Sequence, residues 1–332
     1  MKTLTACFFT LLALASPVYS GTGAAILRTP LSVQQAGIGG IGIAGGDALA
    51  AWKNPAIVAE QDSDFAISAG GGSLLSGKNQ MLLIGGGLKP TAAWGLGAML
   101  FFSGRSIREV NEWGNNTSSE ITQSTIAGGL TLGLNVLKWA GTGLTIKLIR
   151  DDVAGDTVTA VGFDLGARSE IPVLRESGNS TSSNMIIVSA TIRNLGTGLR
   201  PATSNIPADV LPVEATAGLG FARKGLLGAA EYIAEHDRDS RICIGSSFAP
   251  FFPSKLFTLR LGIDGLRNFQ QQLCAGFTVG YRNLVLDYAF QTNPVGDNHR
   301  IALTISFDKP KVASAASYET PAEVANIPEY RR

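Results

Sequence analysis

Alternation of apolar residues with polar or small residues, at a period of two, constrains the fold of this chain more than any other feature. It is clearest near the C-terminus. There, Ile301, Leu303, Ile305 and Phe307 alternate with Ala302, Thr304 and Ser306. Residues 273–281 and 284–290 show the same pattern. A period of two is that of a β-strand with one apolar face. The sequence therefore predicts an all-β protein.

The first twenty residues have the features of a secretory signal peptide. The positive charge of Lys2 precedes an apolar run over residues 4–15, and Gly21 follows the expected cleavage site. Beyond it, no apolar run reaches the about 18 residues that a membrane helix needs. An exported, apolar chain of strands can cross a membrane only as a closed β-barrel. We therefore expect cleavage of the signal peptide and insertion into a bacterial outer membrane. A soluble β-sandwich is the alternative.

Composition agrees with a membrane barrel and excludes several other classes. Charged residues make up only 16% of the chain, and glycine contributes 40 of the 332 residues. The net charge of +1 argues against a nucleic-acid partner. Two histidines and three cysteines are too few for a zinc module. We expect neither a metal nor a cofactor.

Turn residues divide residues 65–307 into about fourteen strands, an even number as in bacterial outer-membrane barrels. The predicted strands include 92–103, 121–137 and 157–168. If the first strand starts at the periplasmic side, most long connections fall outside and most short ones inside, which is the rule for such barrels. The polar stretch 169–183 is an exception because it falls on the inner side.

Four segments follow from this division. They are a signal peptide (1–20), an N-terminal plug (21–64), an antiparallel transmembrane β-barrel (65–307) and a mobile periplasmic tail (308–332). The tail is rich in Ala, Ser, Glu and Pro and has no apolar period, which is typical of a disordered end.

Two motifs make the chain resemble a known family. The glycine-rich segment 36–47, followed by Asn54-Pro55-Ala56, resembles the start of PorV/PorQ-type proteins, which belong to the FadL-like group of fourteen-stranded outer-membrane barrels. Residues 286–290 and 296–301 resemble the closing hairpin of that group. The resemblance covers most of residues 34–307, whereas the tail after Phe307 departs from the family pattern.

The resemblance implies two sets of site residues. A plug motif consists of Asp47, Asn54, Pro55 and Ala56. A closing hairpin contains Asp287, Tyr288, Asp297, His299, Arg300 and Phe307. It also implies a non-enzymatic barrel that docks or shuttles cargo in type IX-like protein secretion. Its partners would then be outer-membrane lipid and secretion-system or cargo proteins. FadL-like transport of a hydrophobic ligand is the first alternative.

Strand parity places seven charged residues on the inward face of the barrel. They are Lys147, Asp164, Arg193, Arg241, Arg260, Asp264 and Asp287. Opposite charges in a narrow lumen pair and crosslink the wall. An open fatty-acid conduit needs an apolar lining, so these charges argue against a simple FadL-type pore. Hydrated, unpaired lumen charges are the alternative. For Asp47 in the plug, Arg193 and Arg260 are the expected cationic neighbours.

The remaining reactive residues give little support for catalysis. His236 and His299 each lie near a carboxylate and could serve as a hydrolase base, but no serine stands near either in a nucleophile motif. An outer-membrane hydrolase is therefore the weakest alternative. Cys243 and Cys274 fall on strands separated by one whole strand, at a distance of about 9–10 Å. That distance exceeds the reach of a disulfide, so we expect two free thiols.

Overall fold

The computed structural model describes most of the predicted plug and barrel. The described residues are 24–45, 47–61, 63–110, 116–153, 155–174, 184–201, 209–250, 256–266, 271–294 and 296–307. The predicted signal peptide and C-terminal tail lie outside them. Among the described helices, none has the length and apolar character needed to span a membrane.

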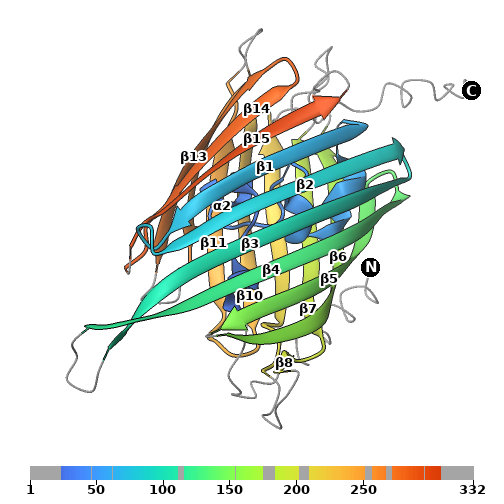
Figure 1. The fold of residues 1–332 in the computed structure, drawn as a ribbon. Helices are drawn as coiled ribbons and strands as arrows, with labels where there is room; N and C mark the ends of the chain where they lie inside the picture. Colours follow the sequence, from blue (N-terminus) through green and yellow to red (C-terminus); the bar gives the residue numbers. More distant parts are fainter. Residues whose placement is uncertain are drawn as a thin grey trace, which may run out of the picture.

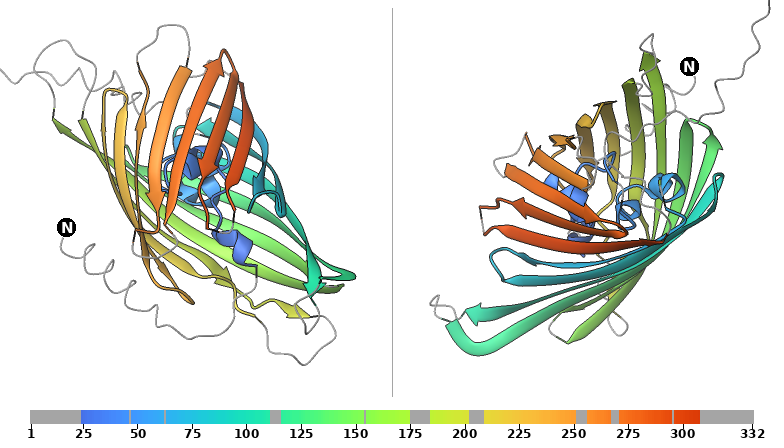
Figure 2. Two further views of the ribbon diagram at one scale, coloured as in Figure 1. Left: turned by 90° about the vertical axis from the view of Figure 1, so that its left-hand side faces the viewer. Right: turned by 90° about the horizontal axis from the view of Figure 1, so that it is seen from above.

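One antiparallel sheet closes on itself into a barrel (Figures 1 and 2). Its strands are β1 Phe65–Leu74, β2 Asn79–Thr91, β3 Trp94–Val110, β4 Asn116–Leu137, β5 Ala140–Val153, β6 Asp156–Leu174, β7 Asn184–Gly196, β8 Arg200–Pro201, β9 Glu214–Arg223, β10 Leu226–Glu235, β11 Arg241–Phe248, β12 Leu256–Asp264, β13 Gln272–Tyr281, β14 Leu284–Gln291 and β15 Asn298–Phe307. The two-residue β8 pairs only with β6, and the other fourteen strands form the barrel. The predicted all-β, fourteen-stranded barrel is confirmed, and a two-sheet sandwich is excluded.

The barrel closes between its first and last strands. Residues Phe65–Ser73 of β1 pair with His299–Phe307 of β15. The rings of Phe65 and Phe307 stack with centroids 5.3 Å apart, and the hydroxyls of Ser68 and Thr304 lie within a hydrogen bond of 2.8 Å. Closure leaves no long open edge, which is the condition for a sheet in hydrocarbon.

The outer face of the barrel is apolar, because the predicted alternation follows the pleat. Along β15, Leu303 is 44% exposed on the outer face, whereas the adjacent Thr304 is 5% exposed and points inward. Among the most exposed outward side chains are Leu82, Leu130, Leu148 and Leu261. Side chains of this kind suit contact with lipid rather than water.

Three strand ends differ most from the sequence prediction. The hairpin of β3 and β4 continues well beyond the predicted ends at 103 and 121 and projects from the barrel (Figure 1). Likewise, β6 continues to Leu174 rather than ending at 168, because its ladder with β7 runs on to the pair Leu174↔Asn184. Polar residues therefore lie within strands at both ends. We take the end with the long β3–β4 hairpin as the outer end.

The segment before β1 lies inside the barrel (Figure 2). It forms four short helices, η1 Ala25–Arg28, α2 Val33–Gly37, η2 Ala50–Trp52 and η3 Pro55–Glu60. At the outer end, Ile26 lines a recess together with Asn79 and Ser103. At the inner end, the Gln61 amide donates to the carbonyl of Gly87 (3.2 Å). The segment therefore passes through the lumen from the outer end to the inner end.

Candidate plug and lumen site

The Asn-Pro-Ala motif begins the last helix of the segment. The Asn54 side chain accepts a hydrogen bond from the backbone N–H of Ala56 (3.1 Å), which caps η3, and Pro55 occupies the first turn, where its missing N–H costs nothing. The Asn54 amide donates to the carbonyl of Ala167 on β6 (3.4 Å). The motif thus fixes the turn and ties it to the wall.

Glycines in the wall make room for this turn. A Cβ atom at Gly143 would lie 2.4 Å from the carbonyl carbon of Pro55. One at Gly166 would lie 2.3 Å from the Asn54 side-chain oxygen. Real Cβ atoms do not approach so closely, so only glycine lets the plug backbone reach β5 and β6 at these points.

Gly166→Ala should therefore loosen the packing of η3 against the wall without breaking the β-sheet. The overpacking should cost about 1–3 kcal/mol, as extra methyl groups in packed interiors do. Limited proteolysis of the purified barrel should cut within residues 47–61 sooner than in the wild type. The control is Gly228→Ala, where a Cβ meets nothing within 4 Å. Equal cleavage rates in the two variants would contradict the packing argument.

Charged side chains of the wall hold the plug backbone directly. Three arginines donate to plug carbonyls: Arg168 to Ile43 (3.3 Å), Arg193 to Trp52 (3.3 Å) and Arg300 to Pro30 (2.5 Å). In the reverse direction, the Glu231 carboxylate accepts the N–H of Gly42 (2.7 Å). Hydrogen bonds to charged groups are stronger than neutral ones, so this set anchors the segment at several points along its length.

The seven predicted lumen charges all lie on the inward face and enter ion pairs. The Lys147 ammonium is 2.5 Å from the Asp164 carboxylate, and both side chains are fully buried. The other pairs are Arg260–Asp287 (3.6 Å), Arg241–Asp264 (3.3 Å), Arg241–Glu235 (3.3 Å) and Arg193–Glu214. Paired charges crosslink the wall between strands, whereas an isolated buried charge would be costly.

Several residues of this network were missed in the sequence analysis. They are Glu214, Glu231 and Glu235 of the wall and Trp52 and Lys53 of the plug, all buried. Parity could have found two of them, because Glu231 and Glu235 share the inward face of β10 with Leu227 and Ile233. No periodic signal marks the two plug residues, which lie outside any strand.

Asp47 lies at the contact between plug and wall. Its carboxylate accepts hydrogen bonds from the Ser32 hydroxyl (2.7 Å) and from the backbone N–H of Leu49 (3.2 Å). Its pKa is raised to about 7, chiefly because the carboxyl is buried and secondly because Asp287 lies nearby. The Ser32 hydrogen bond and the charge of Arg260 act in the opposite direction. Of the two arginines expected near Asp47, Arg260 is thus the one whose charge acts on it.

The raised pKa predicts that the seated plug is weaker at neutral pH than in mild acid. A carboxyl with a higher pKa in the seated state than in water stabilises that state at low pH, and this stabilisation is lost as pH rises from about 4 through about 7. Channel openings in planar bilayers should therefore be more frequent at pH 7.5 than at pH 5.5, and Asp47→Asn should remove most of the difference. Lys53, whose pKa burial lowers to about 8, acts in the opposite direction and mainly above this window. Identical pH profiles for wild type and Asp47→Asn would refute the assignment.

The largest cluster of buried apolar side chains in the described lumen lies on one arc of the wall, and a second cluster packs Ile38, Ile41 and Ile43 of the plug against β7, β9, β10 and β11. The largest cluster, between the plug and β1–β6, includes Leu74, Met81, Leu83, Met99, Phe101, Ala127 and Ile149 from the wall, with Leu27, Leu31, Leu49, Trp52 and Val58 from the plug. On β1–β4, the buried polar side chains are hydroxyls: Ser68, Ser103, Thr125 and Thr131. The buried charges of the described wall come from β5 onward. The inward charges that argued against a simple FadL-type pore are therefore absent from the described part of β1–β4.

The closing hairpin places its residues on different faces. His299 lies on the outer face and shares a hydrogen bond of 2.9 Å with the Tyr288 hydroxyl, whereas Arg300 and Asp287 point into the lumen. The Asp297 carbonyl accepts the N–H of Ser76 in the β1–β2 turn (2.9 Å). His236, the other histidine, is half-buried just after the end of β10.

Cys243 and Cys274 are free and buried, as predicted. Cys243 lies on β11 and Cys274 on β13, with β12 between them. In the described part of the chain, no three His, Cys, Asp or Glu side chains come together as metal ligands would.

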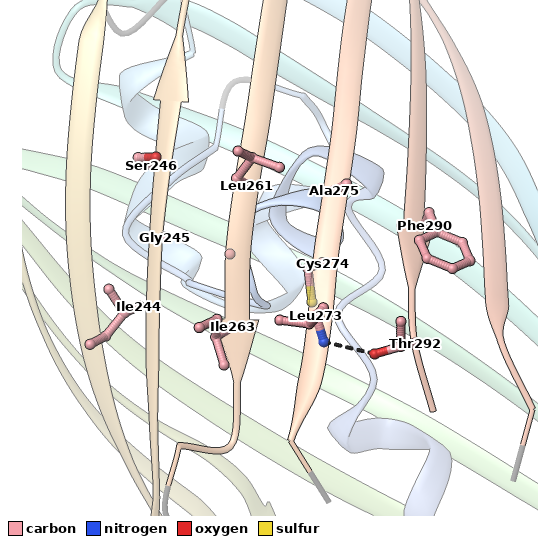
Figure 3. A pocket seen from close by; sticks show the side chains of 11 residues that line it. Ile244, Gly245, Ser246, Leu261, Ile263, Leu273, Cys274, Ala275, Phe290 and Thr292 are labelled. Carbon is pink, nitrogen blue, oxygen red and sulfur yellow. Dashed lines mark hydrogen bonds between the residues drawn. The ribbon is translucent and has the colours of Figure 1, made fainter. Parts of the chain in front are cut away.

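A recess of about 560 Å³ opens on the outer face across β11–β14 (Figure 3). Ile244, Leu261 and Leu273 line it, and the N–H of Leu273 donates to the Thr292 hydroxyl (2.8 Å). Its floor includes Gly245 and Gly262, behind which the plug residue Ile38 lies close enough to exclude any Cβ. The wall between lipid and plug is therefore thin at this point.

Comparison with known proteins finds similar folds but no matching family profile or curated sequence. No protein-family profile and no curated protein matches the chain. Among solved structures, the toluene transporter TbuX of Ralstonia pickettii aligns with a TM-score of 0.53 at 9% identity, over 84% of this chain and 98% of that one. The toluene transporter TodX of Pseudomonas putida aligns with a TM-score of 0.51 at 10% identity, over 88% and 99%. A FadL homologue of Pseudomonas aeruginosa aligns with a TM-score of 0.50 at 11% identity, over 83% and 98%. The chain therefore has the barrel fold of FadL-type proteins.

Proposed function

We propose that this chain is a non-enzymatic outer-membrane channel of FadL type that passes a small hydrophobic molecule into the periplasm. The apolar arc carries the proposal. It runs beside the plug from Leu74 at the outer end to Gly95 and Gly133 near the inner end, which lie against Val58 of η3. An apolar solute can follow such a surface without desolvating the charges on the opposite arc.

The outer face supports the membrane location, and the lumen supports a closed resting state. Apolar side chains cover the outer face, as a bilayer requires. The plug fills the lumen through the contacts described above, so passage needs a displacement of residues 24–61. We regard the segment 21–64 as a movable plug. The hydrogen bonds that Arg168, Arg193, Arg300 and Glu231 make to its backbone are the contacts that reseat it.

The similar structures favour transport over secretion. Two of them are described as toluene transporters, and none of the three is described as a secretion component. Docking of cargo in type IX-like secretion, which the PorV/PorQ resemblance implies, gains no support from them. A pull-down from detergent-solubilised envelopes that returned secretion-system proteins would restore that interpretation.

Uptake by intact cells tests the proposal. A Gram-negative host that lacks its own hydrocarbon channel should take up radiolabelled toluene faster when it produces this barrel. Leu83→Gln should lower the initial rate, because it places an amide on the apolar arc. Leu226→Gln makes the same change at the inner rim, outside the lumen, and should leave the rate unchanged. Uptake equal to that of cells without the barrel would disprove the proposed function.

A further inference from the structure

Trp52 stands where the apolar arc meets the charged arc. Its indole is fully buried in the apolar cluster, and a Cβ at Gly129 of β4 would lie 3.3 Å from the ring. The Lys147 ammonium lies 4.0 Å from the ring centroid, and Lys147 pairs with Gly129 in the β4–β5 ladder. An ammonium at this distance from the face of a tryptophan is attracted by the ring quadrupole.

Lys147 is fixed to the wall independently of the plug. Its ammonium contacts the Asp164 carboxylate (2.5 Å) and the Asn194 side-chain oxygen (3.1 Å), and all three residues are fully buried. A lysine ammonium has three donors, so two of them point at wall partners. The Trp52 ring covers the ammonium on the plug side.

Displacement of the plug would separate these two groups. Trp52 belongs to η2 and would move with the plug, whereas Lys147 would stay with β5, Asp164 and Asn194. The ammonium would then face the apolar arc without its aromatic cover. An aromatic solute can replace the indole over the ammonium, but a saturated ring of the same size has no π face and cannot.

We propose that Trp52 and Lys147 form a gate that favours aromatic solutes over saturated ones of equal size. This inference rests on the proposed transport function and adds its selectivity. The plug opens at Trp52, and the Lys147 ammonium then binds a solute with an aromatic face more favourably than a saturated one. Toluene and methylcyclohexane, which share one carbon skeleton, separate this property from simple hydrophobicity.

Competition between these two solutes tests the gate in the full-length barrel in intact cells. We expect the wild type to take up toluene about tenfold faster than methylcyclohexane, relative to cells without the barrel. A tenfold ratio corresponds to ~1.4 kcal/mol, which lies within the range of buried cation–π contacts. The double variant Lys147→Met/Asp164→Asn removes both charges together and should bring the ratio to about one. Lys147→Arg should keep the preference.

Trp52→Leu provides a second, independent variant. It uncovers Lys147 without disturbing its ion pair, so toluene uptake should rise more than methylcyclohexane uptake. Trp139→Leu, at the exposed inner rim, is the matched control and should change neither rate. Heat-modifiable migration on gels shows whether each variant has folded.

The outcomes separate the gate from the channel. If neither solute enters faster than in cells without the barrel, the transport function itself is wrong. If both enter equally fast in the wild type, or if the double variant folds and keeps the tenfold ratio, transport stands and the gate is refuted.

Discussion

Deleting residues 35–50 should turn a closed barrel into a stable open pore. The deleted segment supplies Ile38, Ile41, Ile43 and Leu49 to the buried clusters of the lumen, along with the carbonyl that Arg168 holds. The barrel should survive, because its closure rests on the β1–β15 ladder and the hydroxyl pair Ser68–Thr304. Water entering the lumen would hydrate the wall charges that lose plug partners. Single-channel recording in planar bilayers should show a large, steady conductance that the wild type lacks.

A matched variant distinguishes loss of the plug from damage to the wall. Gly166→Ala leaves the segment in place and only loosens η3, so its conductance should be intermittent and smaller than that of the deletion. Both variants should retain heat-modifiable migration on gels. A deletion variant that folds but conducts no better than the wild type would mean that loops or the wall charges close the lumen. Residues 35–50 would then not act as the plug.

The barrel was predictable because its signal is local and repeated. The period-two pattern of β15, with Leu303 outside and Thr304 inside, requires no knowledge of the other strands. Strand ends were harder to place. Polar residues beyond 103 suggested a loop, yet the β3–β4 ladder continues to the pair Val110↔Asn116, because two strands that project from the barrel into water need no apolar face.

Part of the lumen was predictable residue by residue, but its contacts with the plug were not. Parity alone placed Lys147 and Asp164 inward, and their pairing follows from the β5–β6 ladder, where Thr145 opposes Asp164. The absence of inward charges before residue 147 was already part of the prediction. The packing of the plug against these first strands was not predictable, because it depends on where residues 24–61 lie within the barrel. The contact between Lys147 and Trp52 joins two segments far apart in sequence, and neither segment has a sequence pattern that indicates contact with the other.

Leu303→Arg should be the most destabilising single substitution on the outer face of β15. Leu303 lies in the middle of the strand, opposite Ala69 of β1 and Leu286 of β14, and its side chain is directed at lipid. An arginine at the bilayer midplane costs about 2–4 kcal/mol in barrels of this class. The free energy of unfolding from lipid vesicles, measured by denaturant titration, should fall by this amount.

The same substitution at Leu284, the first residue of β14 after the inner turn, should cost only about 0–1 kcal/mol, because the cost of a charged side chain declines toward the interface. Since both variants exchange leucine for arginine on one face of adjacent strands, their difference isolates depth in the membrane. Equal losses would mean that Leu303 does not lie in the hydrocarbon layer, and the barrel would then sit in the membrane at a different height from the one its outer face indicates.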